Sequence, residues 1–116
     1  MVFSPEQVAE LKGYCSKVSE LTEGGLTFLH LEALRLPRGC EPPSCDALLR
    51  PVDGDGYPSR LYLSVQVQSS YTRNWNVINA RICEKNWYAF SWKVVPRSPT
   101  LVEILKGHLE GFTQEK

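Results

Sequence analysis

The chain has 116 residues, of which 42% are apolar and 22% are charged. This length and balance predict one compact domain, residues 1–116, with a core of its own. The 13 lysines and arginines equal the 13 aspartates and glutamates, so the formal net charge is zero. Because nonspecific binding to phosphates needs a basic surplus, nucleic-acid binding is not expected as the main activity.

No apolar run approaches the ~20 residues that a membrane-spanning helix needs, so no membrane partner is expected. The N-terminus, Met1 to Glu6, lacks the basic and then apolar regions of a secretory signal. We therefore expect a cytoplasmic protein whose cysteines are reduced thiols, namely Cys15, Cys40, Cys45 and Cys83.

The N-terminal segment predicts a helix from Ser4 to about Gly24. Ser4 is a good N-cap, and Pro5 suits the first helical position. Apolar residues then recur at spacings of three or four, as on one face of a helix: Val8, Leu11, Cys15, Val18 and Leu21. Gly24-Gly25 predicts the end of this helix.

Three strands are predicted next, over residues 26–36, 45–52 and 61–67. The last of them alternates apolar and polar residues most regularly. Residues 69–79 are polar and predict an irregular loop, followed by a short extended piece that carries Cys83.

A final helix is predicted to begin after Thr100, because Thr100 can cap it and Glu103 can close a capping box. Its buried face is expected to contain Leu101, Ile104, Leu105, Leu109 and Phe112. Strands that lie between two helices predict an α+β fold. We expect an N-terminal helix, an antiparallel meander of about four strands, an irregular active-site loop and a C-terminal helix.

Cys83 is the candidate nucleophile, since it follows a polar, amide-rich stretch. Thiol catalysis needs a reachable sulfur, a cationic or hydrogen-bonding neighbour, and a donor for an oxyanion. Arg81 can favour the thiolate, Asn76 or Asn79 can donate to the oxyanion, and Glu84 would raise the thiol pKa. The competing interpretation makes Cys83 a small buried hydrophobic residue and the asparagines turn formers.

The remaining candidates have weaker patterns. Cys40 and Cys45 lack a second pair of ligands at a suitable spacing, so no metal and no cofactor is expected. His30 and His108 are expected to be structural or surface residues. Several aromatic residues lie near Cys83: Trp87 and Trp92 are expected in the core, whereas Trp75 and Tyr88 are candidate contacts for a partner protein.

Three motifs resemble those of the ubiquitin-conjugating enzymes, in particular the short forms found in bacterial ubiquitin-related operons. Tyr57-Pro58 resembles their Tyr-Pro element, and Asn74-Trp75-Asn76 resembles their His-Pro-Asn element with only the last residue retained. Ile82-Cys83 resembles their active-site Ile-Cys, with Trp92, a proline and a helix after it. The order of elements matches as well, so the resemblance implies the ubiquitin-conjugating fold.

The resemblance also implies an activity. Cys83 would accept the C-terminal acyl group of a ubiquitin-like protein from an activating enzyme, and the amine of a target protein would then attack the thioester. Asn76, or otherwise Asn79, would stabilise the oxyanion. A bacterial ubiquitin-like system of this kind implies a JAB-type protease as a further partner, with antiphage defence as one setting.

Two departures from the family pattern leave a second function open. Asn74 and Trp75 replace the histidine and proline of the His-Pro-Asn element, and the spacing from Asn76 to Cys83 is one residue shorter than usual. The missing His-Pro pair, together with the short C-terminus, favours a catalytically inactive protein of the same fold that acts as a protein-binding module. A third interpretation is an unrelated α+β domain whose motifs match by chance.

Overall fold

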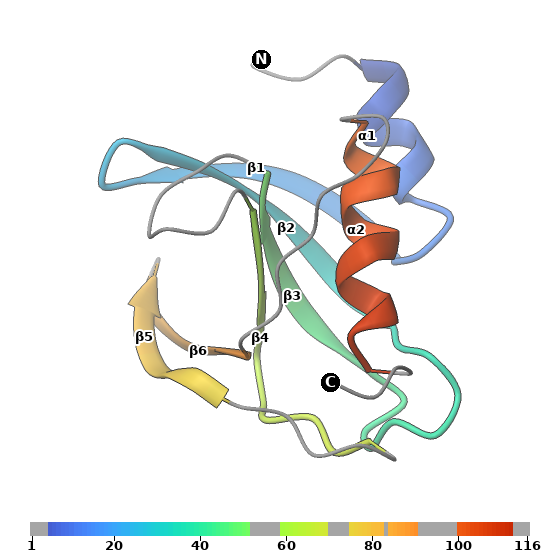
Figure 1. The fold of residues 1–116 in the computed structure, drawn as a ribbon. Coiled ribbons are helices and arrows are strands. Elements are labelled where there is room, and N and C mark those ends of the chain that lie inside the picture. Colours follow the sequence, from blue (N-terminus) through green and yellow to red (C-terminus); the bar gives the residue numbers. More distant parts are fainter. Residues whose placement is uncertain (1–4, 52–58, 70–74, 83, 91–99, 113–116) are drawn as a thin grey trace.

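The computed structural model describes residues 5–51, 59–69, 75–82, 84–90 and 100–112. In these residues two short helices lie on one face of a sheet of six strands (Figure 1). The helices are α1 (Pro5–Leu11) and α2 (Leu101–Glu110), and the strands are β1 (Lys17–Glu23), β2 (Leu26–Arg35), β3 (Ser44–Arg50), β4 (Arg60–Leu63), β5 (Trp75–Ile82) and β6 (Lys85–Phe90). The spatial order is β1-β2-β3-β4-β6-β5, and every neighbouring pair is antiparallel.

The expected ubiquitin-conjugating fold, with a meander of about four strands and an irregular active-site loop, is therefore wrong. The described residues form a mostly antiparallel sheet of six strands with two short helices, which is a different architecture. Two segments account for the difference: the second half of the predicted first helix and the predicted loop are both strands. Neither described helix is long and apolar enough to cross a membrane.

The first helix ends at Leu11, and residues 17–23 form β1 instead of continuing it. β1 pairs with β2 without interruption, from Lys17 opposite Glu32 to Glu23 opposite Leu26. Gly24 and Gly25 connect the two strands with φ values of 62° and 79°. Two positive φ angles in a two-residue connection are typical of a tight hairpin, so this glycine pair turns a hairpin and does not end a helix.

The predicted loop over residues 69–79 is a strand from Trp75 onward. β5 pairs with β6 from Trp75 opposite Phe90 to Ile82 opposite Lys85, with two register shifts between these ends. β5 is an edge strand, and an edge strand tolerates the polar residues that suggested a loop. The remaining strand predictions hold approximately, since β2 spans most of residues 26–36 while β3 and β4 end earlier than expected.

The last helix is as predicted. The side chain of Thr100 caps α2 by accepting a hydrogen bond from the backbone N–H of Glu103 at 3.4 Å. The predicted apolar side chains are buried: Leu101, Ile104, Leu105, Leu109 and Phe112. They pack in the main core between the helices and the sheet, with Leu11 of α1 and with residues of β2, β3 and β4.

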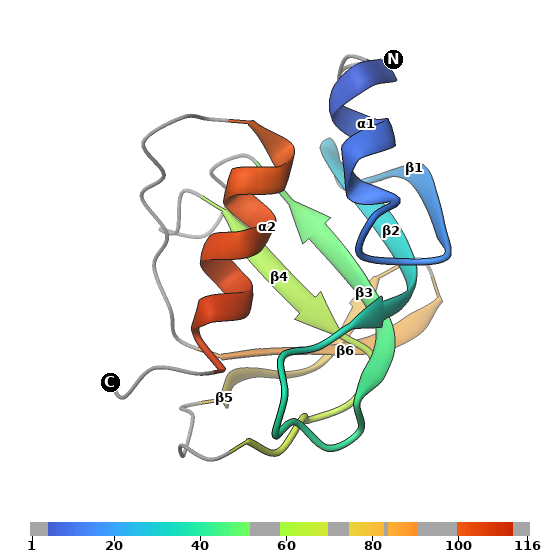
Figure 2. The same ribbon diagram turned by 90° about the vertical axis from the view of Figure 1, so that its right-hand side faces the viewer.

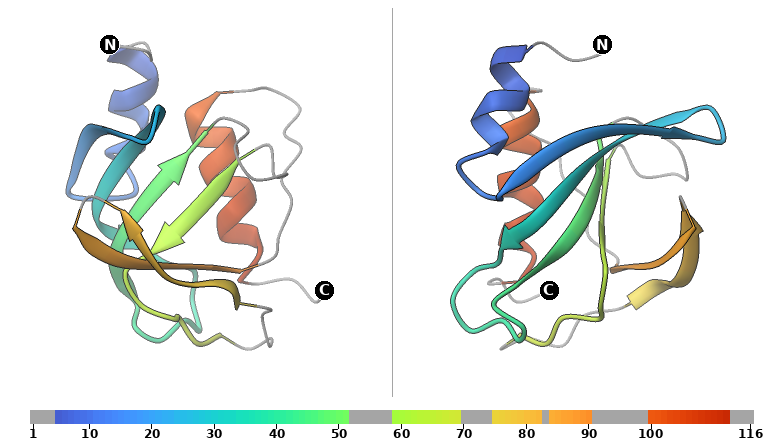
Figure 3. Two further views of the ribbon diagram at one scale, coloured as in Figure 1. Left: turned by 90° about the vertical axis from the view of Figure 1, so that its left-hand side faces the viewer. Right: turned by 180° about the vertical axis from the view of Figure 1, so that it is seen from behind.

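A second apolar cluster fills the other face of the sheet. It contains Phe28, Leu48, Tyr62, Ile82, Trp87 and Ala89. The cluster joins the β5–β6 hairpin to the central strands, which the hairpin crosses steeply (Figure 2). Trp87 is 2% exposed, which confirms its predicted place in the core, whereas Trp92 lies outside the described residues. The left panel of Figure 3 shows the β5–β6 hairpin toward the viewer, with both helices on the far side of the sheet.

Replacing Gly111 with alanine should lower the free energy of unfolding by about 1–3 kcal/mol, because the core next to it is already filled. Gly111 caps α2 with an ordinary helical φ of −59°, so the backbone itself would accept alanine. An added Cβ, however, would lie 2.8 Å from Cε2 of Phe90. The Phe90 ring has little room to move, since it packs edge-on against Trp75 and Phe112.

Urea denaturation would measure this effect, with Gly13→Ala as the matched control. A Cβ on Gly13 would meet only the carbonyl oxygen of Glu10 at 3.5 Å, an ordinary contact. The control variant should therefore be as stable as the parent or slightly more stable. Equal stability of the two variants would contradict the proposed clash at Phe90.

Candidate functional site

Cys83, the candidate nucleophile, lies outside the described residues, but its chain neighbours belong to the β5–β6 hairpin. Ile82 pairs with Lys85, and Glu84 is exposed with a φ of 66°. The chain on both sides of Cys83 is therefore a β-hairpin and not the expected irregular loop.

β5 separates Asn76, the expected oxyanion donor, from this end of the hairpin. Asn76 follows Trp75 at the start of β5, and Ile82 is six residues further along the strand. Extended residues rise about 3.3 Å each, so the two positions are roughly 20 Å apart along the strand. A hydrogen bond needs a separation of about 3 Å, so the backbone does not bring these two positions together. The side chain of Asn76 is outside the described part.

Asn79 and Tyr88, which were predicted for different roles, lie together. The Tyr88 hydroxyl donates a hydrogen bond to Oδ1 of Asn79 at 2.8 Å. Asn79 has a left-handed φ of 57° and lies at one of the register shifts of β5. The Asn79 amide is therefore directed toward Tyr88 across the hairpin, and its carbonyl oxygen is already occupied.

Arg81 is exposed and lies opposite Asn86 in the β5–β6 ladder. Its Nη1 donates a hydrogen bond to Oδ1 of Asn86 at 3.4 Å. This pair is next to the Ile82–Lys85 pair that closes the described ladder. No motif in the sequence marks Asn86, because only the strand register shows that it faces Arg81.

The two candidate partner contacts have different surroundings. The Trp75 ring is half-buried, with its centroid 5.3 Å from that of Phe90, so it packs largely against the core. Tyr88 is half-buried on the outer face and lines a surface pocket of about 330 Å³ with Ser64, Val65 and Gln66. Val65 and Ile78 are 40% and 57% exposed, the large apolar side chains most open to solvent in the described part. Tyr88 and Val65 thus share one surface pocket with the uncharged side chains of Ser64 and Gln66.

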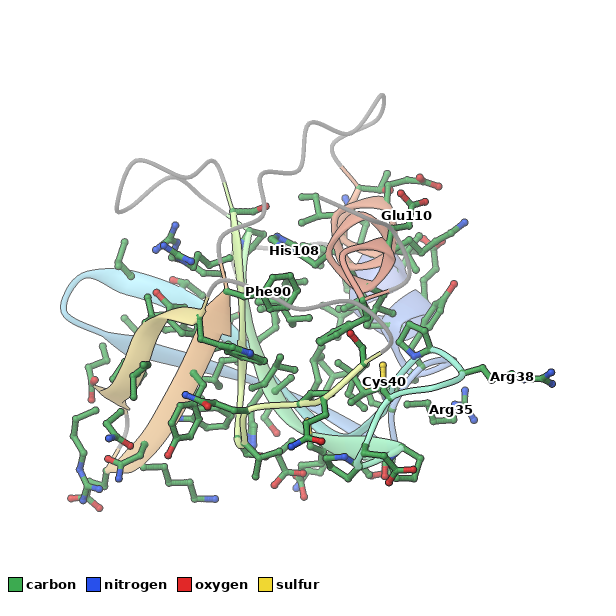
Figure 4. All side chains as sticks on the ribbon, turned by 60° about the horizontal axis from the view of Figure 1, so that its bottom comes forward. Arg35, Arg38, Cys40, Phe90, His108 and Glu110 are labelled. Carbon is green, nitrogen blue, oxygen red and sulfur yellow. The ribbon has the colours of Figure 1, made fainter. Side chains whose placement is uncertain are left out.

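The three described cysteines are poor nucleophiles. Burial raises the pKa of Cys15, Cys40 and Cys45, so each is a protonated thiol at neutral pH. Cys40 is 4% exposed and belongs to the connection between β2 and β3 (Figure 4). No three histidine, cysteine, aspartate or glutamate side chains gather as a metal site within the described residues.

A buried polar pair, His108 and Ser59, joins α2 to the sheet. His108 is 4% exposed, and its Nε2 lies 2.8 Å from the hydroxyl of Ser59, just before β4. Burial, together with the positive charges of Arg60 and Arg50, lowers the pKa of His108 to about 3. Figure 4 shows His108 on the side of α2 that faces the sheet. Since Ser59 is also buried, this pair is inaccessible to a substrate and holds the helix in place.

No family model, curated protein or solved structure matches the chain. The case for a function therefore rests on the chain's own residues.

Proposed function

We propose that the chain is a thiol acyl carrier in which Cys83 forms a thioester with the C-terminus of a ubiquitin-like protein. Elimination among the cysteines carries this proposal. Burial raises the pKa of Cys15, Cys40 and Cys45, which leaves Cys83, next to the buried Ile82 and the exposed Glu84 in the chain, as the remaining candidate nucleophile. The class of partner rests on the sequence motifs Tyr57-Pro58 and Ile82-Cys83.

The proposed reaction is a pair of acyl transfers. The Cys83 thiolate attacks the thioester carbonyl of the charged activating enzyme, and the thiolate of that enzyme leaves. The amine of a target protein then attacks the new thioester, and the Cys83 thiolate leaves with the electron pair of the broken C–S bond. Arg81 favours the thiolate and Glu84 opposes it. Because β5 carries Asn76 away from this end of the hairpin, the oxyanion donor is not assigned to Asn76. The hydrogen bond from Tyr88 engages Oδ1 of Asn79 and not its Nδ2 amide, the group that would donate to an oxyanion.

The test is to incubate the protein with the activating enzyme, ATP and the ubiquitin-like protein, and to separate the products without reductant. An adduct that dithiothreitol cleaves should form with the parent chain and be lost in Cys83→Ala. Cys40→Ala and Cys45→Ala are matched controls and should retain the adduct. Absence of the adduct with the cognate partner, or its persistence in Cys83→Ala, would overturn the proposal.

A second candidate function is binding without catalysis, and the surface pocket that Tyr88 lines favours it. Val65 lines the same pocket and is 40% exposed, so it offers an apolar side chain to a partner there. In this case calorimetric titration with the ubiquitin-like protein should give equal affinities for the parent and Cys83→Ala. Val65→Glu should weaken the binding. Unchanged affinity of Val65→Glu would exclude this pocket as the contact.

A further inference from the structure

The two edges of the sheet differ in regularity. β5, at one edge, contains two register shifts and the left-handed residue Asn79, which interrupt the pattern that another strand would follow. β1, at the other edge, pairs with β2 through all seven of its residues without a shift. In the described part of the chain, β2 is the only strand beside β1. A regular edge of this kind offers backbone N–H and C=O groups to a further strand.

The charges along β1 are self-complementary. β1 begins with the exposed Lys17 and ends with the exposed Glu23. When two copies of β1 lie antiparallel and are aligned at Glu20, Lys17 of each copy faces Glu23 of the other. Opposite charges placed directly across a strand pair stabilise that pairing. The zero net charge of the chain adds no overall repulsion between copies.

The partly covered side chains of β1 also suit this arrangement. Val18 and Leu21 are half-buried and pack on opposite faces of the sheet, Val18 with the main core and Leu21 with the second cluster. Side chains alternate between the two faces of a strand, so Lys17 and Glu23, six positions apart, lie on the same face. Pairing Lys17 with Glu23 therefore keeps equivalent faces of the two sheets on the same side. A second copy would therefore extend both apolar layers and cover more of these two side chains.

We propose that β1 is a homodimer contact, at which two copies pair antiparallel about Glu20 and form one continuous sheet. Lys17–Glu23 pairs lie at both ends of this contact. Glu20 lies at its centre and faces its counterpart, and one of its carboxylate oxygens is buried without a hydrogen-bond partner within the described chain. Two facing carboxylates oppose association, so Glu20 limits the strength of the dimer.

The test is sedimentation equilibrium of the whole chain over a wide range of concentrations. The parent should show a reversible monomer–dimer equilibrium. Lys17→Glu and Glu23→Lys should each weaken dimerisation about tenfold, since both end pairs then join like charges. An equimolar mixture of these two variants should restore dimerisation, because every end pair again joins opposite charges. Glu20→Gln should strengthen the dimer.

Lys106→Glu is the matched control, because Lys106 is an exposed lysine on α2, away from β1. It makes the same change of charge and should leave dimerisation unchanged. A parent chain that remains monomeric at every concentration would overturn the proposal. The proposed alignment would be wrong if the two variants failed to dimerise when mixed.

Discussion

Acidification from pH 7 to pH 4 should lower the free energy of unfolding by about 3 kcal/mol through His108 alone. Burial, with Arg60 and Arg50 nearby, lowers the pKa of this side chain from 6.5 to about 3 in the folded state. Between these two values the unfolded chain binds a proton at His108 that the folded chain does not bind. The contribution of neutral, buried His108 to the free energy of unfolding is therefore fully present above pH 6.5, and it is lost as the pH falls toward 3.

Urea denaturation at several pH values would measure this loss, and His108→Gln is the informative comparison. Glutamine does not titrate, and its amide can reach toward Ser59 as the imidazole Nε2 does. His108→Gln should be less stable than the parent at pH 7, but the difference should shrink as the pH falls to 4. If the two proteins lost stability in parallel, the acid sensitivity would come from other groups.

Replacing Trp87 with alanine should lower the free energy of unfolding by about 3–5 kcal/mol. The side chain is 2% exposed, lies within the second cluster, and meets the His30 ring edge-on at 6.0 Å. Its Nε1 donates a hydrogen bond to the carbonyl oxygen of Ile82 at 3.0 Å. β4 and β6 share only one registered residue pair in the described ladder, Leu63 with Tyr88. The β5–β6 hairpin is therefore held to the central strands mainly by the second cluster, and the loss of Trp87 from that cluster should have a large effect.

Two variants separate these contributions in urea denaturation. Trp87→Phe keeps an aromatic ring but leaves the Ile82 carbonyl without its donor, and should cost about 1–3 kcal/mol. Tyr88→Ala removes the neighbouring aromatic side chain, which is half-buried on the outer face, and should cost less than Trp87→Ala. A similar loss for Trp87→Ala and Tyr88→Ala would show that the second cluster does not hold the hairpin.

Part of the candidate site was visible in the sequence, and part was not. The residue types near Cys83 point to thiol chemistry whatever the fold is. The neighbours of each side chain depend on the register of β5 against β6, which directs Asn79 to Tyr88 and Arg81 to Asn86. A shift of one residue in that register would exchange the two faces of the hairpin, so residue spacing alone cannot identify these partners.

The same division holds for the fold. Local residues account for α2, because the Thr100 cap and the apolar face act within a few residues of chain, and the side chains of that face are the buried ones. The conformation of residues 17–23, which form β1, depends instead on long-range pairing. Val18 and Leu21 have helical spacing from Leu11, yet they lie on opposite faces of a strand. The Gly24-Gly25 turn brings residues 17–23 against β2, where they form ladder hydrogen bonds and bury apolar side chains. These interactions stabilise the strand by more than local helix propensity stabilises a helix in this segment.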